Sequence, residues 1–228
     1  MSATVNGVIF WDFDGTLAHR PGMWRGCLLT ALAVVDPDHA ASEEAIRRGL
    51  SDGFPWHAPS IAHLEIRTPE QWWSSLTPVL VRALEGAGVT PTLAVAAAQL
   101  APRIYSDPQF WQVFDDTRPA LALLQQNGWR HVVLSNHCPE LPALVADLGL
   151  VDLIEDVITS AATGYEKPNP AMFQIALDRA PSSRVWMVGD NPMVDIDGAT
   201  AVGIPAILVR DQPGHDLQWA AHEILDGN

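Results

Sequence analysis

Five short apolar runs, rich in β-branched residues, recur along this 228-residue chain, and each ends in small or polar residues. Continuous apolar runs of this length are typical of strands buried on both faces, as in a parallel sheet. Helical patterns lie between the later runs, and a glycine stands where most of these helices should end. The predicted strands are 7–13, 131–134, 156–159, 185–188 and 206–209, and the helices between them are 119–127, 141–148, 171–180 and 195–202. This alternation predicts a doubly wound α/β core with right-handed crossovers.

The first strand is separated from the rest of this pattern by about 100 residues. The interval carries helical stretches and proline-rich turns in place of strands. The predicted helices are 23–35, 42–50, 69–85 and 92–105. We interpret residues 18–106 as a helical domain inserted after the first strand, and residues 1–17 together with 107–228 as the α/β core domain.

Polar side chains follow the predicted strands of the core. In an open parallel sheet, ligands bind beyond the carboxyl ends of the strands. We therefore expect the residues at these ends to meet at one edge of the sheet. They are Asp12 and Asp14 after the first strand, Ser135 and Asn136 after the second, Asp190 and then Asp195 after the fourth, and Lys167 from segment 164–170.

The acidic members of this set predict a metal site. Two carboxylates one residue apart, such as Asp12 and Asp14, repel each other unless a cation or a proton compensates them. A hard divalent ion such as Mg2+ prefers oxygen ligands. We expect Asp12, Asp14 and Asp190 to bind it, while Asp195 is either a further ligand or a group that orients Lys167 or a water.

The same residues suit phosphoryl transfer. Asp12 would attack phosphorus and form an aspartyl-phosphate. Asp14 would protonate the leaving alkoxide and then activate the water that hydrolyses the intermediate.

The remaining polar residues are expected to bind the phosphate. Ser135, with neighbouring backbone N–H groups around Asn136, would contact the non-bridging oxygens, and Thr16 belongs to the same predicted set. Lys167 would add a positive charge beside them.

In this order, the motifs resemble those of the haloacid dehalogenase (HAD) superfamily. The resemblance covers residues 1–17 and 107–228 and implies a Rossmann-like core. The helical insertion resembles the C1-type cap of this family, which closes over the site. The motifs that carry the resemblance are Asp12-Phe13-Asp14-Gly15-Thr16, Ser135-Asn136, Lys167-Pro168 and Gly189-Asp190 with Asp195.

The expected function is that of a Mg2+-dependent phosphatase acting on a small phosphorylated metabolite. A phosphomutase would use the same aspartyl-phosphate and the same acid/base, and is the first alternative. A haloacid dehalogenase needs no second acid, so the presence of Asp14 argues against it. A non-catalytic binding protein is the least favoured alternative, because all the reactive residues are present.

Composition limits partners and location. The net charge of −14 disfavours nucleic-acid binding. No run approaches the roughly 18 apolar residues that span a bilayer, and residues 1–7 show no leader pattern. The only cysteines are Cys27 and Cys138, which fits a reducing compartment. We therefore expect a cytoplasmic protein, either a monomer or a homodimer.

Nine tryptophans are many for this length. Those of the helical insertion either pack its interior or line the surface that faces the substrate. His137, next to Ser135 and Asn136, is a candidate substrate contact. The aromatic residues to which these alternatives apply are Trp24, Phe54, Trp56, Trp72 and Trp73.

Overall fold

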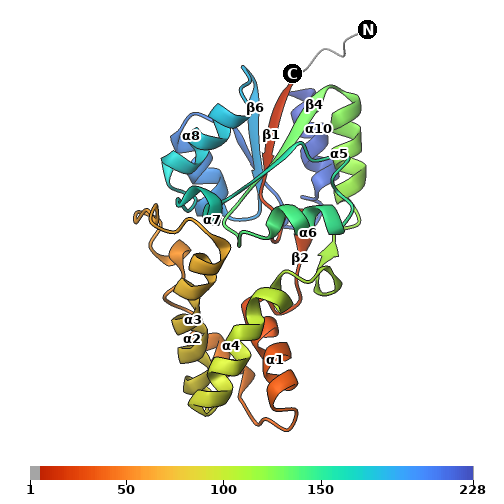
Figure 1. The fold of residues 1–228 in the computed structure, drawn as a ribbon. Coiled ribbons are helices and arrows are strands. Elements are labelled where there is room, and N and C mark those ends of the chain that lie inside the picture. Colours follow the sequence, from red (N-terminus) through yellow and green to blue (C-terminus); the bar gives the residue numbers. More distant parts are fainter. Residues whose placement is uncertain (1–5, 228) are drawn as a thin grey trace.

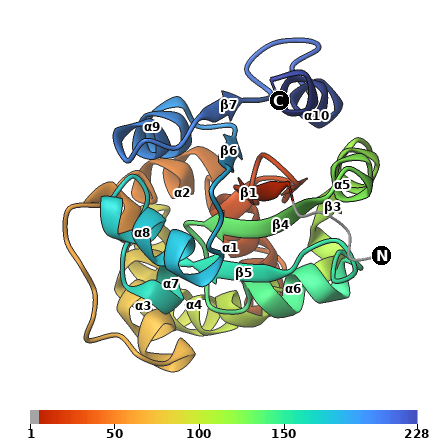
Figure 2. The same ribbon diagram turned by 90° about the horizontal axis from the view of Figure 1, so that it is seen from above.

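A five-stranded parallel sheet forms the centre of the α/β core (Figures 1 and 2). The computed structural model describes residues 6–227, so residues 1–5, part of the segment without a leader pattern, lie outside the described residues. The strand order is β5-β4-β1-β6-β7, so the chain winds outward in both directions from β1. The strands are β1 (Gly7–Trp11), β4 (Trp129–Ser135), β5 (Asp156–Thr159), β6 (Val185–Gly189) and β7 (Ala206–Leu208). All five predicted strands, and the doubly wound Rossmann-like fold, are confirmed.

Helices cover both faces of this sheet (Figure 2). Alternate residues of β1 point to opposite faces. Trp11 therefore packs with α5 (Thr117–Gln126) and α10 (Leu217–Asp226), while Phe10 packs with α8 (Pro170–Arg179) and α9 (Gly198–Ala201). Gly128, Gly149 and Gly203 follow helix ends with φ of 81°, 71° and 80°, which confirms them as cap positions. The core also contains α6 (Leu141–Asp147) and α7 (Ser160–Thr163).

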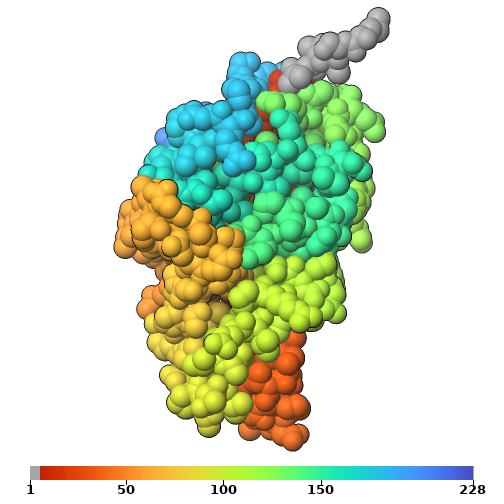
Figure 3. Space-filling view, in the orientation of Figure 1, coloured from red at the N-terminus to blue at the C-terminus, as the bar shows by residue number. Residues whose placement is uncertain are grey.

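Four helices follow β1 and pack together beneath the carboxyl edge of the sheet (Figure 1). They are α1 (Met23–Val35), α2 (Glu43–Gly49), α3 (Pro69–Gly86) and α4 (Pro91–Tyr105), joined in part by the short helix η1 (Pro55–His57). The helices predicted in this interval are therefore present. In the space-filling view, this orange-to-yellow segment lies directly against the core (Figure 3). None of the helices among residues 6–227 combines the length and the apolar character that a membrane span requires.

A small antiparallel ribbon joins the two ends of the helical segment. It pairs β2 (Ala18–His19) with β3 (Gln112–Val113), which follows the short helix η2 (Pro108–Phe110). The sequence did not predict this ribbon. The domain limits 17/18 and 106/107 stay a prediction; the ribbon pairs Ala18, at the first limit, with Val113, which follows the second limit along the chain.

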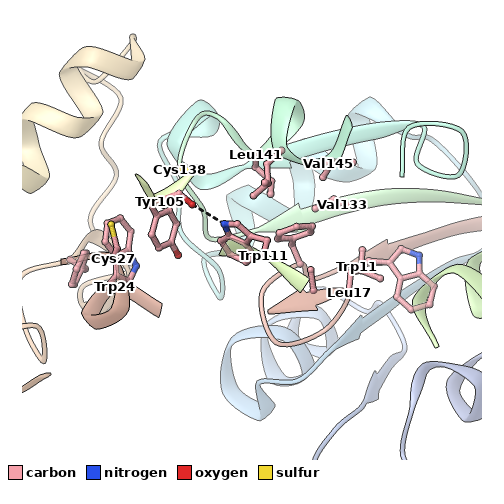
Figure 4. Close-up of a cluster of buried hydrophobic side chains, with 14 of the residues drawn as sticks. Trp11, Leu17, Trp24, Cys27, Tyr105, Trp111, Val133, Cys138, Leu141 and Val145 are labelled. Carbon is pink, nitrogen blue, oxygen red and sulfur yellow. Dashed lines mark hydrogen bonds between the residues drawn. The ribbon is translucent and has the colours of Figure 1, made fainter. Parts of the chain in front are cut away.

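Aromatic side chains connect the core of the sheet to the helical segment (Figure 4). Phe13, just after β1, contacts Trp111 with ring centroids 5.3 Å apart, and Trp111 contacts Tyr105 at 5.7 Å. Tyr105 in turn stacks on Trp24 of α1 at 4.0 Å. The Trp111 indole N–H donates to the backbone oxygen of Tyr105 at 2.7 Å. One continuous apolar cluster therefore extends from one face of the sheet into the helices.

Candidate active site

The carboxyl ends of β1, β4 and β6 lie side by side, because Trp11 pairs with both Val133 and Val188. The chain leaves β1 into Asp12, whose backbone N–H donates to the Val188 oxygen at 2.9 Å. Ser135 is the last residue of β4, and Asp190 directly follows β6. The residues predicted at these strand ends do meet at one edge of the sheet.

A tight turn after β1 brings the loop 12–16 against the end of β6. The Phe13 oxygen accepts backbone N–H bonds from Leu17 at 2.9 Å and from Ala18 at 3.0 Å. Gly15 has φ of +88°, and a Cβ at this position would collide with the Asp190 carboxylate. A residue without a side chain is therefore required here.

Three carboxylates form an acidic cluster at this edge. Oxygen atoms of Asp12, Asp190 and Asp195 all lie within 4.8 Å of one another. A set of carboxylate oxygens at this spacing fits a hard divalent cation. Within residues 6–227, Asp14 does not belong to this group. The predicted place of Asp14 among the metal ligands therefore stays a prediction.

Lys167 is the cation that faces this cluster. Its Nζ donates to Asp12 Oδ1 at 2.9 Å and to Asp195 Oδ1 at 2.5 Å, and the residue is only 1% exposed. Burial opposes the charge on Lys167, but the two carboxylates outweigh burial and raise its pKa. Burial also raises the pKa of Asp195 to about 7, against the opposing effect of Lys167.

Asp14 lies in a different environment from its neighbour in the turn. Burial raises the pKa of Asp14 well above its usual range, and the charges of Asp12 and Asp190 raise it further, while Arg20 opposes them. A carboxyl group with a raised pKa retains its proton at a higher pH than usual. Such a group is suited to give a proton to a leaving oxygen and to take one back.

Two of the predicted phosphate contacts have other partners. Thr16 is fully buried, and its hydroxyl donates to Asp190 Oδ1 at 3.1 Å. The Asn136 amide binds the Lys167 backbone twice, donating to its oxygen at 2.9 Å and accepting from its N–H at 2.7 Å. These side chains therefore position Asp190 and Lys167, and their predicted contacts to phosphate stay a prediction. Ser135 and Asn136 both line the cavity beside Asp12, whereas Thr16 does not.

The segment that carries Asp195 is not the predicted α-helix. Residues Pro192–Asp197 form η3, a single π-helical stretch that continues into α9. The Asn191 side chain accepts from the N–H groups of Met193 and Val194, both at 3.1 Å. Asp195 Oδ2 accepts the Asn191 backbone N–H at 3.1 Å. Asn191 therefore caps the turn.

Arg210 supports the acidic loop, and the sequence gave no sign of it. Its guanidinium donates to the Thr16 oxygen at 3.0 and 3.3 Å and forms an ion pair with Asp116 at 2.8 Å. Asp116 also accepts the Leu217 backbone N–H at 2.7 Å. Thus Arg210 ties the turn after β1 to the starts of α5 and α10.

A cavity of about 270 Å3 opens between the acidic cluster and the helical segment. Its lining on the helical side consists of Met23, Trp24, Trp56 and Tyr105. His137 lies at the boundary, and its ring contacts Phe13, Tyr105 and Trp111. Trp24 and Trp56 thus face the cavity, whereas Phe54, Trp72 and Trp73 are 4%, 3% and 6% exposed and pack the interior.

Known proteins share this fold and sequence pattern. Residues 7–203 match the haloacid dehalogenase-like hydrolase family. The human haloacid dehalogenase-like hydrolase domain-containing protein 3 is 37% identical over 212 residues, which cover 89% of this chain and 81% of that protein. A phosphoserine phosphatase of Thermus thermophilus is 31% identical over 135 residues, 58% of this chain and 53% of that protein.

The solved L-2-haloacid dehalogenase of Xanthobacter autotrophicus superposes with a TM-score of 0.64 at 22% identity. The superposition covers 99% of this chain and 84% of that one. At this identity the likeness shows the fold alone, so the chemistry has to be argued from the site residues.

Proposed function

The chain belongs to the haloacid dehalogenase-like hydrolase family, and we propose that within this family it is a Mg2+-dependent phosphatase that cleaves a small phosphate monoester. The observation that carries the proposal is the contrast between the two aspartates of one turn. Asp12 is ion-paired with Lys167 at 2.9 Å, whereas burial and like charges raise the pKa of Asp14. One carboxylate is thus suited to attack and the other to hold a proton.

In the proposed reaction, a carboxylate oxygen of Asp12 attacks phosphorus and the bond from phosphorus to the ester oxygen breaks. Asp14 gives its proton to the departing alkoxide, which leaves as the alcohol. Asp14 then removes a proton from a water molecule, whose oxygen attacks phosphorus. The bond to Asp12 breaks and inorganic phosphate is released.

Lys167 and Ser135 bind and orient in this scheme. The Lys167 ammonium contacts the attacking residue, so it holds the Asp12 carboxylate in place and offers positive charge close to the incoming phosphate. Ser135, at the end of β4, faces the same cavity and can donate its hydroxyl to a phosphate oxygen.

Asp12, Asp190 and Asp195 are the residues that would hold Mg2+, since their oxygens lie within 4.8 Å of one another. When bound, the ion supplies positive charge that offsets the repulsion between the carboxylates and an anionic ester. Thr16 would keep Asp190 oriented for this task through its hydroxyl.

Phosphatase chemistry also agrees with one of the similar proteins, which is named a phosphoserine phosphatase. The dehalogenase alternative remains disfavoured by the second acid, Asp14. The phosphomutase alternative uses the same residues, and it predicts transfer of phosphate back to the organic product in place of release.

Phosphate release from a panel of phosphorylated metabolites tests the proposal. We expect turnover that requires Mg2+ and stops with EDTA, and loss of turnover in Asp12→Asn by at least about 1,000-fold. The Asp14→Asn protein should still form the aspartyl-phosphate slowly, once per molecule, but it should not turn over. Chloride release from 2-chloropropionate by the metal-free protein would contradict the proposal, as would a phosphorylated isomer appearing in place of phosphate.

A further inference from the structure

We propose that the ester carries an uncharged leaving group with a single ring, which lies against the tryptophans of the helical segment. This inference rests on the proposed phosphatase function and adds the class of substrate. The residues that support this inference line the half of the cavity that faces away from the acidic cluster.

The wall on the helical side carries no charge. Every charged residue in the lining belongs to the acidic cluster, to Asp14 or to Lys167. On the helical side the lining consists of Met23, Trp24, Trp56 and Tyr105. The other uncharged lining residues come from the core: Ser135, Asn136, His137, Cys138, Asn191 and Val194. A carboxylate or a second phosphate on the leaving group would lose water there without gaining a partner, which is costly.

His137 adds polarity to this wall without adding charge. Its Nε2 has no hydrogen-bond partner among the described residues, and the residue is 3% exposed. Burial lowers the pKa of His137 to about 4, so the ring is neutral at neutral pH. A neutral ring nitrogen can bond a hydroxyl or amide on the substrate, and it brings no positive charge to balance an anion.

Arg20, a cation at the start of the helical segment, does not line the cavity. Arg20 is 3% exposed and donates to the Met23 oxygen at 2.8 Å. Its guanidinium lies over the rings of Tyr105 and Phe110, at 5.7 and 5.2 Å from their centroids. Tyr105 faces the cavity, whereas Arg20 does not. The positive charge is therefore covered by aromatic rings and gives an anionic leaving group no direct contact.

The size and shape of the cavity favour one ring. Its volume of about 270 Å3 must hold the phosphoryl group as well, and it lies below the roughly 300–1,000 Å3 usual for drug-sized ligands. Trp24 is stacked on Tyr105 with an interplanar angle of 15°, and Trp56 lies 6.0 Å from Trp24. Flat indole surfaces of this kind stack on planar or ring-shaped groups.

Three esters with the same leaving atom test the charge argument: benzyl phosphate, 4-carbamoylbenzyl phosphate and 4-carboxybenzyl phosphate, with methyl phosphate as the ring-free reference. The amide and the carboxylate are nearly equal in shape and differ in charge. We expect kcat/KM to be at least about tenfold higher for the amide than for the carboxylate, and higher for benzyl than for methyl phosphate.

Trp56→Leu tests the stacking argument, with Trp219→Leu on α10 as the matched control, since both tryptophans are half-buried and only Trp56 lines this cavity. We expect Trp56→Leu to lower the benzyl-to-methyl ratio of kcat/KM about tenfold, and Trp219→Leu to leave it unchanged. Equal kcat/KM values for the amide and the carboxylate overturn the inference, and so does an unchanged benzyl-to-methyl ratio in Trp56→Leu. In either case, turnover of methyl phosphate would still support the phosphatase proposal. If none of the four esters is cleaved, the phosphatase proposal fails and the inference falls with it.

Discussion

Removing the positive charge of Lys167 should destabilise the fold as well as stop the reaction. Lys167 and Asp195 are each 1% exposed at their side chains and Asp12 is 11% exposed, so water screens this group of charges little. In Lys167→Met, two carboxylates lose their partner while remaining within 4.8 Å of each other. At an effective dielectric constant of about 20, their repulsion at that separation is about 3 kcal/mol.

This repulsion agrees with the cost of about 3–5 kcal/mol that is typical when one partner of a buried ion pair is removed. We expect urea unfolding at pH 7.5 with EDTA to show a loss of that size. Arg47→Met is the control, because its ion pair with Glu44 is exposed at 59% and 54% of the two side chains. It should lose less than about 0.5 kcal/mol.

Two further conditions identify the cause of the loss. Burial already raises the pKa of Asp195 to about 7 in the presence of Lys167, whereas the unfolded chain has a value near 3.9. The folded variant therefore binds more protons than the unfolded one as the pH falls below 7, and the deficit of Lys167→Met should shrink between pH 7.5 and 5. Saturating Mg2+ should also restore part of the stability that Lys167→Met loses. A loss below about 1 kcal/mol, or a deficit that grows on acidification, would refute the reasoning.

Three other changes have defined outcomes. Gly15→Ala should reduce turnover at least about 100-fold, because the residue has φ of +88° and a Cβ would displace Asp190; wild-type kinetics would contradict this. His131 is buried and burial lowers its pKa to about 4. The folded chain therefore binds fewer protons than the unfolded one between pH 6.5 and 4, and stability should fall by about 3 kcal/mol more in the wild type than in His131→Gln over that range, as measured by urea titration. Arg210→Lys keeps the charge beside Asp116 but loses the paired contacts to the turn after β1. We expect kcat to fall about tenfold with little change in the melting temperature. An unchanged kcat would show that Arg210 does not support the site.

Periodicity predicted the elements that are long enough to show it. The strands of the core and helices such as α1 (Met23–Val35) follow from runs of apolar residues at the proper spacing. The two-residue strands β2 and β3 have no period to recognise. The predicted helix 195–202 begins inside the π-helical stretch Pro192–Asp197, whose geometry depends on the Asn191 cap and on the buried Asp195. Spacing alone does not distinguish this stretch from ordinary helix.

Residue types at strand ends predicted which side chains meet, but not how each is used. Thr16 and Asn136 stand among phosphate-binding motifs in the sequence, yet each hydroxyl or amide is bound to another site residue. Arg210 contacts Thr16 across 194 positions of the chain, and His131 joins Trp11 to the Leu121 oxygen across the core. Such contacts depend on the completed fold and leave no local pattern.

The row of aromatic rings between sheet and helices bears on how new specificities can arise in this chain. Trp24 and Tyr105 touch the cavity and are also 9% and 2% exposed members of the shared apolar cluster. Replacing either of them would weaken the whole protein along with the pocket. Trp56 and Met23 touch the same cavity from half-buried positions. Natural drift or laboratory evolution toward other esters should therefore accumulate changes at Trp56 and Met23 first, and reach Trp24 or Tyr105 only after stabilising changes elsewhere.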